Sequence, residues 1–262
     1  MRTIVSNVIA IYRKELQSYF ASPFAYVVAG IFWLLSGVLF LRILQDVQAV
    51  AAINDRVGVG QPVDVPYDVL VGFLGWLAVL ALFLLPMLSM GLYTEERKLG
   101  TLELLATSPL TNWSVALGKL LGVLTFVLTV VLPLLVYEAI ALSTADPPLS
   151  WRLVALGHFG FLLMAAAILS LGMFISTLTS STIVAAILTF ALMALLLIIN
   201  WLTQSVTGPA GDVLSHLSLL EHYGNLAQGV FEISSVVLLL SYSFLGLFLT
   251  AQSIEVFRYQ RS

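Results

Sequence analysis

The chain has 262 residues, of which 60% are hydrophobic and only 10% carry a charged side chain. A soluble domain carries about 25% charged residues, so this composition excludes a soluble fold and predicts a polytopic, all-α membrane protein. The formal net charge of −3 gives no sign of a nucleic-acid partner, and a sequence without cysteine has no disulfides or thiolate metal sites.

Residues 1–22 have the pattern of an amphipathic helix. Apolar residues recur at three- and four-residue spacing, while Arg13 and Lys14 occupy the other side. A basic helix before a first span is typical of a segment that lies in the inner membrane interface, either as a simple anchor or as a mechanical element. Ser22-Pro23 then predicts the start of a new helix. We expect no cleavable signal peptide, because the chain does not begin with a basic segment followed by an apolar core.

Long stretches without charged residues locate the membrane spans. About 20 apolar residues cross a bilayer as a helix, and four of these stretches fit one crossing each. The stretch 153–211 is long enough for two crossings, and a polar hairpin at 176–181 divides it. We therefore predict six spans at about 23–43, 69–92, 117–142, 152–175, 182–202 and 233–252.

The basic residues predict the orientation of these spans. With the N-terminus inside, eight Lys and Arg residues fall on the cytoplasmic side and three fall on the outer side. Because cytoplasmic loops carry an excess of basic residues, we expect both termini in the cytoplasm.

Two outer segments differ in character. Residues 44–68 are expected to form a loop, because Gly58 and Pro66 argue against one long helix there. Residues 203–232 are apolar but interrupted by glycines. This combination predicts a re-entrant pair of short helices in the outer leaflet, packed on protein so that their backbone is tolerated at that depth.

The one long charged stretch lies within residues 93–112, between the second and third predicted spans. Thr94 can cap a helix, and Glu95 and Glu96 would then favour the positive end of the helix dipole. Gly100 costs a helix about 1 kcal/mol, which indicates either a break or the close approach of another backbone. The chemistry alone leaves two interpretations open, a helix that lies on lipid and a helix that another protein holds.

This stretch, from Glu95 to Leu105, followed by Ser108-Pro109 and Gly118-Lys119, resembles the segment between the second and third spans of ABC-2 type transporter permeases. In that family the segment is a coupling helix that inserts into a groove of the ATP-binding subunit. The resemblance covers the whole chain, 1–262, as one transmembrane domain.

Two further stretches carry the resemblance. Arg13-Lys14-Glu15 with Ser22-Pro23 resembles the connecting helix of the family and its junction with the first span. The N-terminal half, and the segment from Glu221 to Gly224, most resemble the gliding-motility-associated permease subgroup.

The resemblance implies a permease subunit of an ATP-binding cassette exporter in a bacterial inner membrane. Its partners would be a second permease chain, identical or different, membrane lipid, and ATPase subunits that bind ATP and Mg²⁺. The chain has no phosphate-binding loop motif, so we expect no catalysis and no cofactor on this chain. The residues that the resemblance assigns to ATPase coupling are Glu95, Glu96, Arg97, Leu99, Gly100, Thr101, Leu102, Glu103 and Leu105, and those of the connecting helix are Arg13, Lys14 and Glu15.

The substrate class stays open at this point. An apolar pathway is consistent with a lipid, a lipid-linked glycan or a hydrophobic peptide, and also with mechanical force passed to an outer partner without transport. A passive channel and an intramembrane serine protease fit less well, because no ring of polar groups and no nucleophile motif is visible.

A few polar residues suggest other sites. Glu138 is the only acidic residue in a predicted span, but its place near the outer helix end favours an interfacial position over a transport site. We expect His158 to be structural. His216, Glu221 and His222 offer three zinc ligands, but their spacing matches no metal motif, so packing and hydrogen bonding are favoured.

Overall fold

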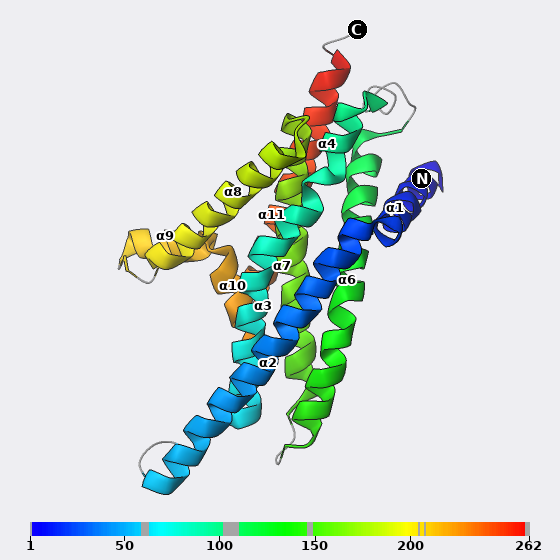
Figure 1. Ribbon diagram of the computed structural model, residues 1–262. Helices are drawn as coiled ribbons and strands as arrows, with labels where there is room; N and C mark the ends of the chain where they lie inside the picture. Colours follow the sequence, from blue (N-terminus) through cyan, green and yellow to red (C-terminus); the bar gives the residue numbers. More distant parts are fainter. Residues whose placement is uncertain are drawn as a thin grey trace.

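The computed structural model describes residues 2–58, 63–101, 110–145, 149–203, 205–206 and 208–259. The described residues form helices and no strand, and six of these helices are long and apolar enough to cross a membrane. The prediction of an all-α fold with six spans is confirmed. Figure 1 shows that α1, α4 and the end of α11 lie at the same end of the helix bundle.

The helices differ in length and are best divided into two groups. The long ones are α1 (Arg2–Ala21), α2 (Pro23–Val57), α3 (Val65–Ser89), α6 (Asn112–Ser143), α7 (Trp151–Leu178), α8 (Thr182–Thr203) and α11 (Ile233–Tyr259). The short ones are α4 (Gly91–Lys98), α9 (Pro209–Leu217) and α10 (Leu219–Ala227).

The centre of the bundle is α7, which packs against α3, α6, α8, α10 and α11. In its most apolar stretch 78% of the residues are buried, whereas the corresponding fractions in α2 and α8 are only 28% and 22%. The contact with α11 is close, because a Cβ on Gly246 would lie only 2.5 Å from Ser170. Since α2 and α8 expose most of their apolar surface, those surfaces are available to lipid or to another chain.

The loop predicted at 44–68 is shorter than expected, because α2 continues to Val57. The helix ends at Gly58, whose φ of 63° is left-handed and whose amide donates to Asn54. Between the predicted span end and Gly58 the chain has neither Gly nor Pro, and Arg42 pairs with Asp46 one turn later at 3.3 Å. The appearance of charged residues marks the end of an apolar span, but it does not end a helix.

The two short helices predicted within 203–232 are present as α9 and α10. The side chain of Ser218 caps α10 by accepting from the amide of Glu221. The Tyr223 hydroxyl donates to the carbonyl of Leu74 in α3 at 2.8 Å, and Leu226 packs on α7 at Gly160. Figure 1 shows both helices beside the middle of the bundle rather than at its lower end.

Candidate coupling site where α1, α4 and α6 meet

The charged stretch begins as a continuation of α3. After Pro86 and a turn at Met90, the chain continues as α4, so Thr94 lies inside a helix rather than at its start. Its hydroxyl donates to the carbonyl of Met90 at 2.6 Å, and the prediction that Thr94 is an N-cap is therefore wrong. The prediction failed because the chain turns at Met90 and α4 already begins at Gly91, three residues before Thr94.

The helix α4 ends at Lys98, and Gly100 has a φ of +71°. This left-handed conformation strongly favours glycine. A Cβ on Gly100 would meet nothing within 4 Å among the described atoms. Of the two interpretations of Gly100, a helix break and a close backbone approach, the described structure therefore supports the helix break.

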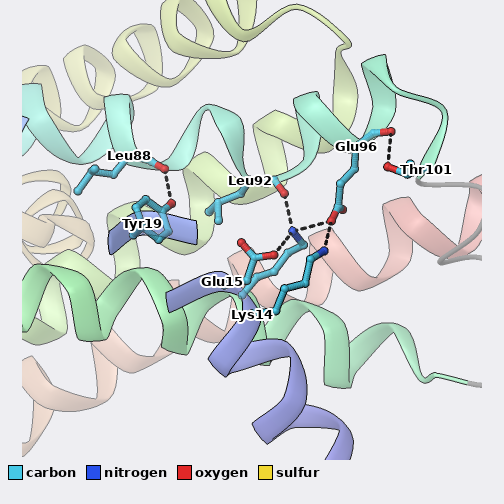
Figure 2. A network of polar contacts seen from close by, with 8 residues as sticks. Lys14, Glu15, Tyr19, Leu88, Leu92, Glu96 and Thr101 are labelled. Carbon is cyan, nitrogen blue, oxygen red and sulfur yellow. Dashed lines mark hydrogen bonds and ion pairs between the residues drawn. The ribbon is translucent and has the colours of Figure 1, made fainter. Parts of the chain in front are cut away.

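Lys119 on α6 is the centre of a buried polar cluster that joins three helices. Its side chain is only 3% exposed, and its ammonium group lies 2.8 Å from Glu15 Oε1 on α1 and 3.0 Å from Glu96 Oε1 on α4. It also donates to the carbonyl of Leu92 at 2.8 Å. Figure 2 shows the Glu15 and Glu96 side chains converging from their separate helices.

Lys14 completes the cluster from the solvent side. Its ammonium group lies 3.5 Å from Glu96 Oε1, and 69% of its side chain is exposed. The two acidic and two basic residues balance, which a buried cluster requires because an unpaired charge in the protein interior is costly. The exposed Lys14 pair contributes little, so Lys119 is the ion that holds the helices together.

The Tyr93 ring gives Lys119 a further partner. The ammonium group lies 4.9 Å from the ring centroid, and Tyr93 is fully buried. A cation over an aromatic face is attracted to the ring, more strongly where water is excluded. The ring and the Leu92 carbonyl both belong to α4, and so does Glu96. Lys119 therefore holds the start of the charged stretch through a main-chain carbonyl, an aromatic ring and a carboxylate.

Two glycines allow α1 to lie directly on α6. A Cβ on Gly118 would lie 2.8 Å from Ile11, and a Cβ on Gly122 would lie 2.7 Å from the Cβ of Glu15. This Gly-x-x-x-Gly pair surrounds Lys119 in the sequence, so the close backbone approach brings α1 within reach of the ammonium group. The helix α1 is present as predicted, but it is packed on α6 and is not only a lipid-surface anchor.

Arg97 connects α4 to a fourth element. Its guanidinium group donates to the carbonyl of Thr177 at the end of α7, at 2.6 Å. The last turn of α4 is thus held both by the central helix and by the Lys119 cluster.

The residues that the sequence assigned to coupling have different surroundings. Lys14, Glu15 and Glu96 come together in the cluster, whereas Arg13, Glu95 and Leu99 are exposed. Thr101 donates to the Glu96 carbonyl at 3.3 Å. Leu102, Glu103 and Leu105 lie outside the described residues.

Sequence reasoning did not identify Lys119 as the partner of Glu15 and Glu96. The residue shares a face of α6 with Val115, Gly122 and Phe126, all of them buried. A lysine within such an apolar stripe indicates a buried cation that needs an acidic partner.

Glu138 and His158 form a second buried polar pair, between α6 and α7. Glu138 lies near the end of α6, as expected, and its side chain is fully buried within the protein, 3.3 Å from His158 Nε2. The other ring nitrogen of His158 lies 2.9 Å from the Val154 carbonyl.

The polar residues of segment 203–232 have partners of their own. His222 contacts the Ser235 hydroxyl at 2.9 Å, and Glu221 accepts a hydrogen bond from the Ser215 hydroxyl.

The comparison with known families decides the broader identity. Residues 65–220 match the family described as ABC-2 family transporter protein, which is more than half of the chain. The chain belongs to the ABC-2 transporter family. The match includes α4, Lys119 and the buried Glu138–His158 pair. No curated protein matches the chain.

As an ABC-2 family member, the protein is a multi-pass transmembrane subunit of an ABC transporter. Such subunits work with separate ABC ATPase subunits, and the family is in general non-catalytic. The buried polar cluster lies at the base of the charged stretch that the sequence resemblance assigns to ATPase coupling.

Proposed function

We propose that this protein is the permease subunit of an ABC exporter, in which ATPase subunits act on segment 95–107. The observation that carries the proposal is the Lys119 cluster. It joins the base of the segment, through Glu96, to the connecting helix and to α6. Force on the segment is then passed to a membrane-crossing helix.

The geometry favours rigid transmission over local bending. The helix α4 is short, and its last turn is bound by Arg97 to α7 and by Glu96 to α6. The glycines of α6 fix α1 in the same unit. A displacement of α4 that keeps these contacts must move α1 and α6 with it, because their charges are too buried to be left unpaired.

The partners follow from the surfaces. A second permease chain, identical or different, would cover apolar surface on α2 and α8, where Trp33, Leu34 and Ile187 are exposed, and lipid would cover the rest. ATP and Mg²⁺ would bind the ATPase subunits. Both termini would lie in the cytoplasm of a bacterial cell, and the location of α1 and the end of α11 at one end of the bundle supports this topology.

The outer segment would be re-entrant and would close the outer mouth of the pathway. Its two helices pack on protein through Tyr223 and Leu226, and they lie beside the middle of the bundle. An amphipathic or lipid-linked substrate suits a pathway with few ionisable groups. A gliding-motility role, in which force reaches an outer partner without transport, is the alternative that the sequence resemblance supports.

The coupling proposal can be tested by co-purification of the ATPase at matched expression. Leu99→Asp and Glu103→Arg change the segment without removing a described member of the Lys119 cluster, and Leu99 is 74% exposed, so we expect Leu99→Asp to leave folding intact. Removing one partner of a buried contact commonly costs about 2–5 kcal/mol, and much less at a rim. We expect both variants to lose the ATPase, whereas Asp55→Arg, an exposed charge reversal on α2, retains it. Retention of the partner by both variants would refute the proposal.

A second comparison separates two roles of Gly100. Asparagine adopts left-handed backbone more readily than valine. If the glycine is needed only for the turn, Gly100→Asn retains the ATPase and Gly100→Val loses it. If the ATPase backbone approaches closely at this point, both variants lose it, since both add a side chain.

A further inference from the structure

A cleft of about 280 Å³ lies beside the Lys119 cluster, between the α1–α2 junction and the α3–α4 turn. Its walls come from α1, α2, α3 and α4, and the first residue of α8 also reaches it. The cleft is polar on one side, where Glu15 and Ser22 lie, and apolar on the other, where Phe24 and Met87 lie. Such a cleft fits a ligand with a polar group and an apolar tail.

The polar side of the cleft carries negative charge. Among the described residues that line it, none is basic, while Glu15 and Glu95 are both acidic. Glu15 is neutralised by Lys119, but Glu95 forms no ion pair within the described part of the chain. One carboxylate is therefore left without a counter-ion.

The Glu95 carboxylate is directed along the cleft wall. Its Oε1 lies 3.4 Å from the position that a Cβ on Gly91 would take, and Gly91 also lines the cleft. Glu15, Tyr19 and Glu95 all line the cleft, and burial together with these two negative charges raises the pKa of Tyr19. The Tyr19 hydroxyl donates to the Leu88 carbonyl at 2.8 Å, which fixes the ring in the wall.

We propose that this cleft binds an ethanolamine phospholipid, with its ammonium group at Glu95 and an acyl chain along Phe24. A primary ammonium supplies three N–H donors, which carboxylate and hydroxyl oxygens accept. Phe24 is 44% exposed at the start of α2, where an acyl chain from the bilayer reaches it. An anionic head group is repelled by Glu95, and a choline group has no N–H to donate.

The lipid site shares Glu95 with segment 95–107, but its test is separate from the coupling proposal because lipid binding to the purified chain requires no ATPase. Glu95 lies outside the Lys119 cluster and is exposed, so Glu95→Gln removes the charge without disturbing the fold. Glu15 is unsuitable for the test, since it also holds Lys119.

The experiment measures lipid binding to the purified full chain in detergent. The probe is a phosphatidylethanolamine with a fluorescent acyl chain, and the comparison lipid is the same molecule with its amine acetylated. We expect acetylation to weaken binding by about fivefold, and Glu95→Gln to weaken binding of the amine lipid by a similar factor. The matched control is Glu232→Gln, an exposed residue just before α11, which leaves binding unchanged.

Each outcome decides the proposal. The ammonium–carboxylate contact predicts that Glu95→Gln does not weaken binding of the acetylated lipid, which is anionic and has no ammonium group to lose, and that added salt weakens the amine lipid alone. Equal binding of the two lipids by wild type overturns the proposal, as does equal binding of the amine lipid by wild type and Glu95→Gln. In that case the cleft holds acyl chains without regard to head group.

Discussion

Replacing Lys119 by methionine removes the most buried of the ions that join α1, α4 and α6. The side chain keeps a similar length, so the change deletes charge rather than volume. The ammonium group has three oxygen partners, Glu15 at 2.8 Å, Glu96 at 3.0 Å and the Leu92 carbonyl at 2.8 Å. Without it, two carboxylates that are only 11% and 14% exposed lose their main counter-ion.

The expected cost follows from this burial. Breaking a buried ion pair by removing one partner destabilises a protein by about 3–5 kcal/mol. Lys14 still lies 3.5 Å from Glu96, which offsets part of the loss, so we expect about 3 kcal/mol for Lys119→Met. By contrast, Lys14 is 69% exposed, and Lys14→Met should cost less than about 1 kcal/mol because water screens that pair.

The assay is unfolding in mixed micelles, followed by tryptophan fluorescence and compared among variants in the same detergent. A triple variant, Lys119→Met with Glu15→Gln and Glu96→Gln, should recover most of the loss, because it leaves no buried charge unpaired. Equal destabilisation by Lys119→Met and Lys14→Met would show that the cluster is solvated and that this reasoning is wrong.

Three more predictions concern helix packing. Gly122→Val should separate α1 from α6 at a cost of about 1–3 kcal/mol, the usual range for overpacking, measured as unfolding free energy; an unchanged value would contradict the close approach. Glu138→Leu should destabilise by about 3 kcal/mol and His158→Leu in the same chain should restore part of this, whereas additive losses in a double-mutant cycle would show that the pair does not interact. Tyr223→Phe should loosen α10, so that a Leu226→Cys probe reacts faster with a thiol reagent in this cysteine-free chain; unchanged reactivity would mean that the hydroxyl bond is dispensable.

The sequence predicts the number and kind of helices well, because both depend on composition along the chain. Apolar length gives six spans, and Ser22-Pro23 gives the start of α2. Helix ends are less well predicted: α2 continues to Val57, since helix-forming residues persist after the apolar stretch ends. Glycine geometry, and not charge, sets that end.

The contacts within the site are harder to obtain from the sequence. Glu15 and Lys119 are 104 positions apart, and no local pattern relates them. The burial of such residues, however, can be predicted from the helix face on which they fall. Glu138 falls on the same face of α6 as Leu134 and Leu142, which are both buried. The helix face on which Glu138 lies therefore predicts its burial better than its position near the end of the helix does.

The composition of the Lys119 cluster also bears on how a coupling movement could occur. An apolar contact between α1, α4 and α6 would resist a shift in proportion to the area exposed, without preferring a second position. Lys119 has acceptors on both partner helices, and Glu96 has a second cation in Lys14. If α4 moved away from α6 alone, Glu96 would keep only the exposed Lys14, and that pair is weak because water screens it. The cluster therefore favours a joint movement of α1, α4 and α6, in which no buried carboxylate loses its cation, and this is what a segment that passes force from a partner to the membrane helices needs.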